Sequence, residues 1–256
     1  MTIAFVLLSG GIDSTTCLHH ALKHFDVVEA ISVDYGQRHV KEAEYAARTC
    51  TRHDVRHTVI KMPNILEGNN VMLTDKDVEI PDIDYADIKG VSPTYVPFRN
   101  GTLLSIITAH AQKWVMEEIQ EQKRIILTKE HPDEVVPVVD DQRLLEHMRD
   151  VTGVYFGAHA EDAHNWAYPD CTPEFIGSMA NAIYTGTYYT VRLHTPLMTL
   201  GKRQIILLGE ELGVDWANTW SCYAGGENHC GTCPTCRARK QGFIDAKVED
   251  PTPYDK

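Results

Sequence analysis

The feature that most constrains the fold is an alternation of short strand-like runs with segments of helical spacing. Residues 3–8, 27–33 and 57–62 have strand character, and residues 14–23 and 39–54 place apolar side chains at helical intervals. Strand, helix and strand joined by short connections are typical of a parallel sheet with helical crossovers. The first run is continuously apolar, as expected of a strand that is covered on both faces.

The rest of the chain continues this pattern with interruptions. Residues 63–97 are rich in Pro, Asn and Asp, and we predict a long loop there, which in a compact domain is more often functional than not. Thr172 and Pro173 suit a helix start, and Gly213 suits a left-handed helix end. We expect helices over 101–122, 141–150, 172–184 and 202–212, strands over 154–157 and 191–195, and paired short strands or an irregular excursion over 123–140. The predicted class is therefore α/β, with an open parallel five-stranded sheet and helices on both of its faces.

Composition and charge narrow the classes of function. The chain has 256 residues, of which 43% are hydrophobic, and a formal net charge of −12, which repels nucleic acid over most of a surface. No apolar stretch approaches the roughly 18 residues of a membrane span, and no secretory signal is recognisable. We expect a cytoplasmic protein with no membrane partner.

The string SGGIDST directly follows the first predicted strand, at residues 9–15. Backbone N–H groups at the start of the next helix, together with the helix dipole, attract an anion, and glycines allow its close approach. The string therefore predicts a phosphate-binding loop, although a plain turn with a Ser or Asp helix cap is the alternative. It is not the GxxxxGK[ST] loop, because no Lys follows the glycines.

The cysteines predict a metal site. Four of the seven, Cys222, Cys230, Cys233 and Cys236, are separated by seven, two and two residues. Four thiolates can enclose one structural Zn²⁺ in a closed tetrahedral site, with no open position for catalysis. An iron–sulfur cluster is the main alternative, and His229 could in principle replace one ligand.

The string LLSGGIDSTT resembles the pyrophosphatase loop of the ATP-cleaving synthetases related to GMP synthetase, asparagine synthetase and the tRNA-thiolating enzymes. The resemblance implies an adenine-nucleotide α-hydrolase-like, Rossmann-like fold that splits ATP into AMP and pyrophosphate. It also implies ATP-binding residues, which are Leu8, Ser9, Gly10, Gly11, Ile12, Asp13, Ser14 and Thr15. Asp13 would act through Mg²⁺ or brace the loop, because a carboxylate and a phosphate repel one another.

Four polar strings follow strands or open helices: VDYGQRH at 33–39, VPFRNG at 96–101, GAHAEDAHNWAYPDC at 157–171 and TPLMTLGK at 195–202. Together with the cysteine motif they resemble the 7-cyano-7-deazaguanine synthase family of queuosine biosynthesis, from residue 3 to about residue 240. The resemblance implies an ATP-dependent ligase that uses 7-carboxy-7-deazaguanine and ammonium. The carboxylate is adenylated, an amide forms, and a second ATP activates the amide for release of the nitrile. A homodimer is also implied.

This chemistry suggests roles for individual residues. Asp162 and Asp170 could accept hydrogen bonds from the amino and ring N–H groups of the substrate, and Arg38 and Arg99 could bind its carboxylate. Lys202 could stabilise charge on the ATP α-phosphate, which makes it a catalytic candidate with Asp13 and Ser14. Asp34 could accept from adenine or ribose. The alternative for each is a surface salt bridge or a helix cap.

The resemblance suggests two regions: a nucleotide-binding domain over 1–215, with insertions near 63–97 and 123–150, and a zinc-binding, partly helical region over 216–256. Residues 113–150 are expected to depart from the family pattern. Two other functions remain open. A tRNA thiolase needs a reactive cysteine, for which Cys171 is the candidate, and a zinc-knot binding module could use the basic residues Arg237, Arg239 and Lys240.

Overall fold

The protein is described by a computed structural model that covers residues 1–36, 41–63, 66, 73–74, 91–92, 94–130, 141–159, 161–162 and 167–256. Within this part of the chain, no helix is both long enough and apolar enough to cross a membrane.

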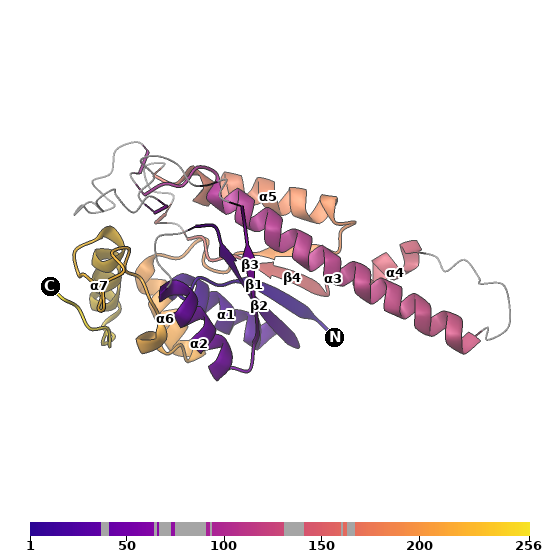
Figure 1. Ribbon diagram of the computed structural model, residues 1–256, viewed down its shortest axis with the longest axis horizontal. Helices are drawn as coiled ribbons and strands as arrows, with labels where there is room; N and C mark the ends of the chain where they lie inside the picture. Colours follow the sequence, from indigo (N-terminus) through magenta and orange to yellow (C-terminus); the bar gives the residue numbers. More distant parts are fainter. Residues whose placement is uncertain are drawn as a thin grey trace.

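A five-stranded parallel sheet forms the centre of the molecule (Figure 1). Its strands are β1 (Ile3–Leu7), β2 (Val27–Asp34), β3 (Arg56–Lys61), β4 (Thr152–Tyr155) and β5 (Val191–His194), in the order β3-β2-β1-β4-β5. All four pairings are parallel. The predicted fold class is therefore confirmed.

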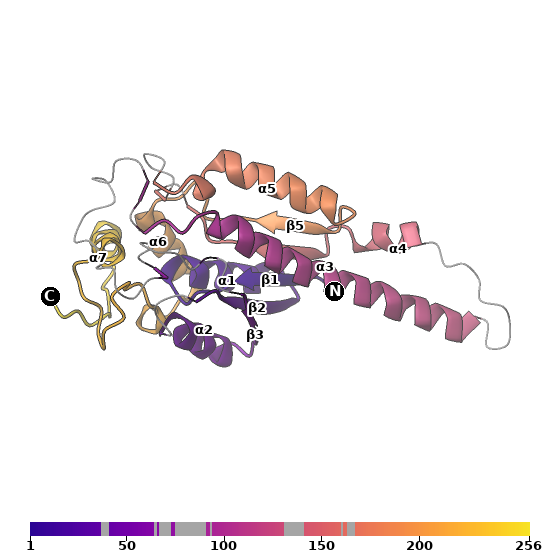
Figure 2. The same ribbon diagram turned by 45° about the horizontal axis from the view of Figure 1, so that its top comes forward.

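Helices cover both faces of the sheet because the side chains of β1 alternate between two hydrophobic clusters. Ala4 and Val6 pack with α1 (Ile12–His24), α2 (Lys41–Arg52), α6 (Lys202–Leu212) and α7 (Pro234–Ala246). Phe5 and Leu7 pack with α3 (Arg99–Glu130), α4 (Asp141–Met148) and α5 (Pro173–Gly186). Figures 1 and 2 show the two layers of helices on opposite sides of the strands.

The strand order positions the site. The chain runs from β1 outward to β2 and β3, and α3 then carries it back to β4 on the other side of β1. The connection that leaves β1 runs toward β2, and the connection that leaves the neighbouring β4 runs the opposite way toward β5. Open α/β sheets bind ligands in the crevice that forms between two such connections.

The prediction for residues 123–140 is wrong over its first part, because α3 continues without a break to Glu130. The string KRIILTKE contains strong helix formers and no Gly or Pro, so nothing in it ends the helix. The remaining residues, 131–140, lie outside the described residues, as does most of the predicted loop over 63–97.

The C-terminal region packs on the same core as the sheet. Phe243 and Ala246 of α7 belong to the cluster that contains Val6, and Trp216 meets Phe243 edge to face. The side chain of Arg239 is buried and donates to the carboxylate of Asp250, which ties the C-terminal tail to α7. The division into regions 1–215 and 216–256 stays a prediction.

Candidate active site and four-cysteine cluster

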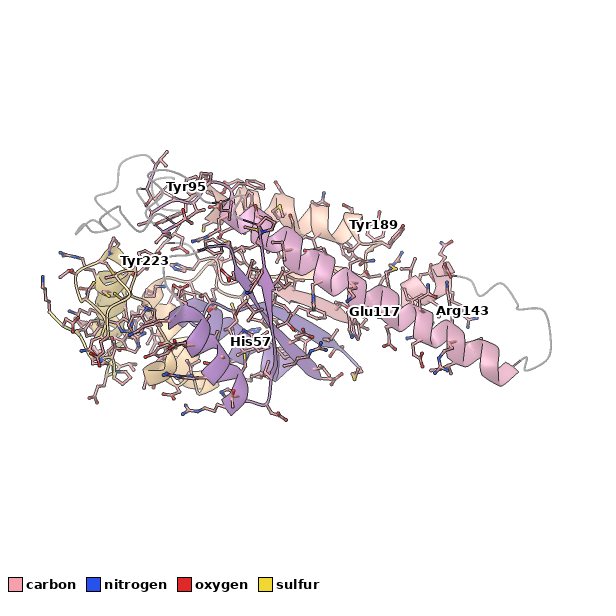
Figure 3. The ribbon with its side chains drawn as sticks, in the orientation of Figure 1. His57, Tyr95, Glu117, Arg143, Tyr189 and Tyr223 are labelled. Atoms are coloured by element: carbon pink, nitrogen blue, oxygen red, sulfur yellow. The ribbon has the colours of Figure 1, made fainter. Side chains whose placement is uncertain are left out.

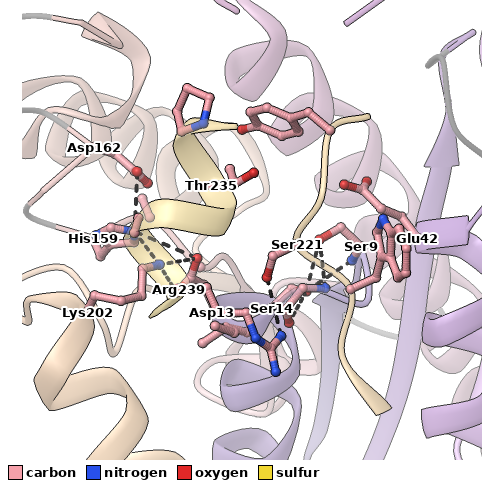
Figure 4. A pocket seen from close by; sticks show the side chains of 18 of the residues that line it. Ser9, Asp13, Ser14, Glu42, His159, Asp162, Lys202, Ser221, Thr235 and Arg239 are labelled. Carbon is pink, nitrogen blue, oxygen red and sulfur yellow. Dashed lines mark hydrogen bonds and ion pairs between the residues drawn. The ribbon is translucent and has the colours of Figure 1, made fainter. Parts of the chain in front are cut away.

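A cavity of about 880 Å³ lies at the carboxyl ends of the strands. Its walls come from the turns after β1, β2 and β4, the first turns of α2, α3 and α6, and residues 220–241 near the cysteines. Figure 3 places Tyr95, near the start of α3, and Tyr223, beside α7, at the same end of the molecule. Figure 4 shows the cavity from close by.

The SGGIDST string forms the turn between β1 and α1. Ser9 and Ser14 face one another, with their hydroxyl oxygens 3.1 Å apart, and the Ser9 N–H donates to Ser14 Oγ at 3.2 Å. The N-cap of α1 is Gly11, and no side chain among the described residues caps it. Because the alternative reading required a Ser or Asp cap, the geometry favours a loop that leaves the helix N-terminus open to an anion.

The two glycines of this turn are needed for different reasons. A Cβ atom on Gly10 would lie 2.5 Å from the carbonyl oxygen of Glu42 and 2.8 Å from the backbone nitrogen of Ala46, and Gly10 has a φ of +83°. Gly10 therefore allows α2 to approach the loop. A Cβ atom on Gly11 would meet nothing closer than 3.5 Å. No other part of the described protein therefore requires glycine at this position, and we attribute the glycine to the close approach of a ligand.

Four charged or titratable side chains meet beside this turn. Lys202 Nζ lies 2.7 and 2.9 Å from the carboxylate oxygens of Asp13 and 3.1 Å from His159 Nε2. His159 Nε2 lies 3.3 Å from Asp162 Oδ1, and Figure 4 shows the four side chains pointing toward one another. Burial raises the pKa of Asp13, but Lys202 and His159 outweigh it and lower that pKa below its usual value. Asp13 is thus a carboxylate held in place by a lysine that lies 189 residues further along the chain.

Arg99, the first residue of α3, lies on another wall of the cavity. Phe98 before it has a φ of +53°, and its ring lies where a Cβ on Gly101 would be, 2.4 Å from the nearest ring atom. The backbone N–H of Asn100 donates to Asp170 Oδ2 at 2.9 Å. A bulky residue in the left-handed region is strained, so Gly101 and Asp170 together hold the start of α3 and the backbone of Arg99.

The predicted ligand-binding residues fall into three groups. Those that line the cavity are Leu8, Ser9, Gly11, Ile12, Asp13, Ser14, Arg99, Asp162 and Lys202. Those that the structure places outside the lining are Gly10, Thr15, Asp34 and Asp170. Asp34 is exposed and accepts from the Gly36 N–H, and Asp170 is 3% exposed behind the cavity wall. Arg38 lies outside the described residues.

Sequence reasoning missed several cavity residues. His159 is absent from the predicted site residues, yet it is 3% exposed and in contact with Lys202 and Asp162. Glu161, its near neighbour in the chain, accepts from the Lys202 N–H at 3.0 Å and so holds the start of α6. The string GAHAED carried a signal for both, but Glu42 lies in a segment that carried none.

The four predicted cysteine ligands come together. The sulfur atoms of Cys222, Cys230, Cys233 and Cys236 all lie within 4.8 Å of one another, which suits a single metal ion. His229 lies outside the cluster that could hold an ion, and its Nε2 accepts from the Ser221 N–H at 3.0 Å. Burial raises the pKa of the Cys171 thiol, and the hydrogen bond that the Asn100 side-chain amide donates to its sulfur offsets this only in part, so Cys171 is mostly a neutral thiol and a poor nucleophile.

Comparison with known sequences identifies the family. The model of a family described as "Queuosine biosynthesis protein QueC" matches residues 3–135 and 143–247. The chain belongs to this family. Because the QueC match includes residues 113–135 and 143–150, the predicted departure over 113–150 is wrong for most of its length.

Full-length relatives and one distant structure complete the comparison. A "7-cyano-7-deazaguanine synthase 1" from Colwellia psychrerythraea is 36% identical over 253 residues, covering 98% of this chain and 97% of that protein. A "7-cyano-7-deazaguanine synthase" from Thermoplasma volcanium is 36% identical over 258 residues, covering 99% and 91%. The structure of a U34-tRNA thiolase from Methanococcus maripaludis has a TM-score of 0.41 at 14% identity, covering 95% of this chain and 64% of that one.

The two glycines of the turn offer a matched test. We expect Gly10→Ala to lower the free energy of unfolding by about 2 kcal/mol or more, because the new methyl group meets backbone atoms and a positive φ. Gly11→Ala should leave the free energy of unfolding within about 1 kcal/mol and weaken ATP binding at least tenfold, since its methyl group would meet the ligand. Chemical denaturation and ATP titration of both variants measure this. Equal effects of the two substitutions would contradict the assignment.

Proposed function

We propose that the chain is an ATP-dependent ligase that converts 7-carboxy-7-deazaguanine and ammonium into 7-cyano-7-deazaguanine. Membership of the family and the near-complete coverage of the synthase relatives support this function. The observation that carries it at the level of residues is the meeting of Lys202, Asp13 and His159 beside an open helix N-terminus. ATP cleavage between the α- and β-phosphates needs such a cation next to an anion cradle.

In this proposal the start of α1 binds the β- and γ-phosphates, and Ser9, Gly11 and Ser14 face them. Lys202 moves its ammonium group from Asp13 to the α-phosphate, where negative charge grows during adenylation. The ion pair with Asp13 keeps Lys202 oriented until the nucleotide arrives, at N–O distances of 2.7 and 2.9 Å. Because the Lys202 side chain is already ordered by this ion pair, it loses little further conformational entropy when the nucleotide binds.

The carboxylates beside Lys202 are suited to bind Mg²⁺. Asp13 and Asp162 are carboxylates at the edge of the cavity, with side chains 29% and 31% exposed, and Mg²⁺ prefers oxygen ligands of this kind. When bound, the ion neutralises phosphate charge. His159 lies between the two carboxylates and fixes their spacing, at 3.7 Å from Asp13 Oδ2 and 3.3 Å from Asp162 Oδ1.

Arg99 is the proposed partner of the substrate carboxylate. Its guanidinium is near Tyr35 and Tyr223, and their influence raises the pKa of Arg99 despite its burial, so the side chain remains a cation. A guanidinium can hold a carboxylate through two parallel hydrogen bonds. Such a grip would present one carboxylate oxygen to the α-phosphate while excluding water.

The four cysteines are proposed to bind a structural Zn²⁺. Their donor set is closed and all-sulfur, and Cys233 is also the N-cap of α7, so the metal would fix the start of that helix. When bound, the ion supplies cross-linking rather than Lewis-acid chemistry. Free ammonium as the nitrogen source and a homodimeric state remain predictions.

The function is tested by isotope exchange between ATP and pyrophosphate. We expect exchange only when 7-carboxy-7-deazaguanine is present, because adenylation is reversible and needs the acid. Exchange that requires tRNA instead would favour a thiolase. A folded, metal-loaded protein that shows no exchange under any condition would favour a binding module and overturn the proposal.

The role of Arg99 is tested by comparing the acid with its amide. Arg99→Gln should raise the KM for 7-carboxy-7-deazaguanine about tenfold or more, because a charged hydrogen-bond donor is lost. The KM for the neutral 7-amido intermediate should change far less, and Arg99→Lys should fall between the two. An equal effect on acid and amide, with an unchanged melting temperature, would contradict carboxylate binding.

The metal is tested by elemental analysis of the purified protein. We expect one zinc per chain in the wild type, and insoluble or zinc-free protein for Cys233→Ser, since three ligands no longer close the site. Cys50→Ala removes a thiol of the core outside the cluster and should keep its zinc. An active variant of Cys233 without metal would disprove the structural role, and iron in place of zinc would point to a cluster.

A further inference from the structure

The proposed mechanism assigns no role to the carboxyl group of Glu42, which lines the cavity. Glu42 lies in the first turn of α2 and lines the cavity beside Ser9 (Figure 4). Among the described residues its carboxylate has neither a hydrogen-bond partner nor an ion-pair partner. A carboxylate in a partly buried place normally has such partners, so a residue of this kind needs an explanation.

The backbone of Glu42 cannot withdraw from the cavity. Its carbonyl oxygen is the atom that a Cβ on Gly10 would meet at 2.5 Å, so the start of α2 is pressed against the phosphate loop. The preceding Lys41 is directed elsewhere: its ammonium group donates to the carbonyl oxygens of residues Gly226 and Glu227 and lies 4.6 Å from the centre of the Trp220 ring. The fold thus holds Glu42 in place and keeps the nearest lysine away from it.

The surroundings of Glu42 make its charged form less favourable than that of an exposed glutamate. Burial raises its pKa to about 7, with partial compensation by Arg99. A bound molecule with N–H donors would restore the carboxylate and satisfy it. Tyr35 and Tyr223 line the same cavity, and aromatic side chains of this kind can pack against a planar heterocycle.

We propose that Glu42 is a recognition residue whose carboxylate accepts hydrogen bonds from the amino group of a bound purine-type ring. This inference rests on the proposed function, in which two molecules of this chemistry enter the cavity: the adenine of ATP and 7-carboxy-7-deazaguanine. Both carry an exocyclic amino group, and the experiment separates them. Glu42 then sets specificity for an amino-bearing ring, while Arg99 and Lys202 bind the negative charges.

The test compares Glu42→Gln with Glu44→Gln in steady-state kinetics. Glu44 lies on the same helix, its side chain is 54% exposed, and its ion-pair partner is Arg48 at 4.0 Å, so its substitution is a matched control. We expect Glu42→Gln to raise one KM about tenfold or more, with kcat within about threefold and the other KM unchanged. A rise for ATP assigns the contact to adenine, and a rise for the acid assigns it to the deazaguanine.

Analogues that lack the amino group make the test specific. Purine riboside triphosphate replaces ATP, and the 2-desamino acid replaces the substrate. If Glu42 binds the amino group, the penalty of Glu42→Gln disappears with the matching analogue, which a structural role would not produce. An unchanged pair of KM values, a lower kcat alone, or a penalty that persists with both analogues would overturn the inference. Substrate-dependent exchange in the wild type and in Glu44→Gln shows separately whether the proposed function holds.

Discussion

Gly10 is the point at which the parts of the site are joined. On one side of it the backbone of α2 approaches so closely that no side chain fits, and on the other its carbonyl oxygen accepts the N–H of Trp220 at 2.8 Å. The phosphate loop, the helix that carries Glu42 and the segment that leads to the cysteines therefore share one residue. A displacement of any of the three would move the other two, because close-packed contacts transmit small shifts.

The ion pair between Asp13 and Lys202 is a second interaction that connects distant parts of the site. Asp13 and Lys202 are 189 residues apart, yet the fold places both at the starts of helices that meet beside β1. Because the formal net charge is −12, the proposed binding of a triphosphate and a carboxylate requires cations concentrated at the cavity. Lys202 and Arg99 supply two such cations on different walls of one cavity. Their separation suits a reaction that brings two anions together, since each anion has its own counter-charge.

Local signals explain which parts of the site could be predicted from the sequence. The predicted phosphate loop and the four clustered cysteines consist of residues near one another in the chain, so local motifs were enough to predict them. Glu42 could not be found in this way, because its exposure to the cavity depends on how closely α2 packs on Gly10. Asp170 illustrates the opposite case. Its motif marked it as a ligand, but the carboxylate accepts from the Asn100 N–H inside the wall. The extension of α3 to Glu130 was not predicted, although residues 123–130 contain no Gly or Pro to end a helix.

The cysteine region is part of the cavity as well as a folding element. Trp220, Ser221 and Tyr223 flank Cys222 and line the cavity, and Thr232, Pro234 and Thr235 lie between the other ligands and line it too. A metal held by Cys222, Cys230, Cys233 and Cys236 would cross-link these two strings of wall residues within a span of 15 positions. Trp220, two positions before Cys222, donates its N–H to the Gly10 carbonyl, so a metal bound there would add support to one side of the predicted phosphate loop. A metal bound there would therefore shape the wall of the cavity without reaching into it.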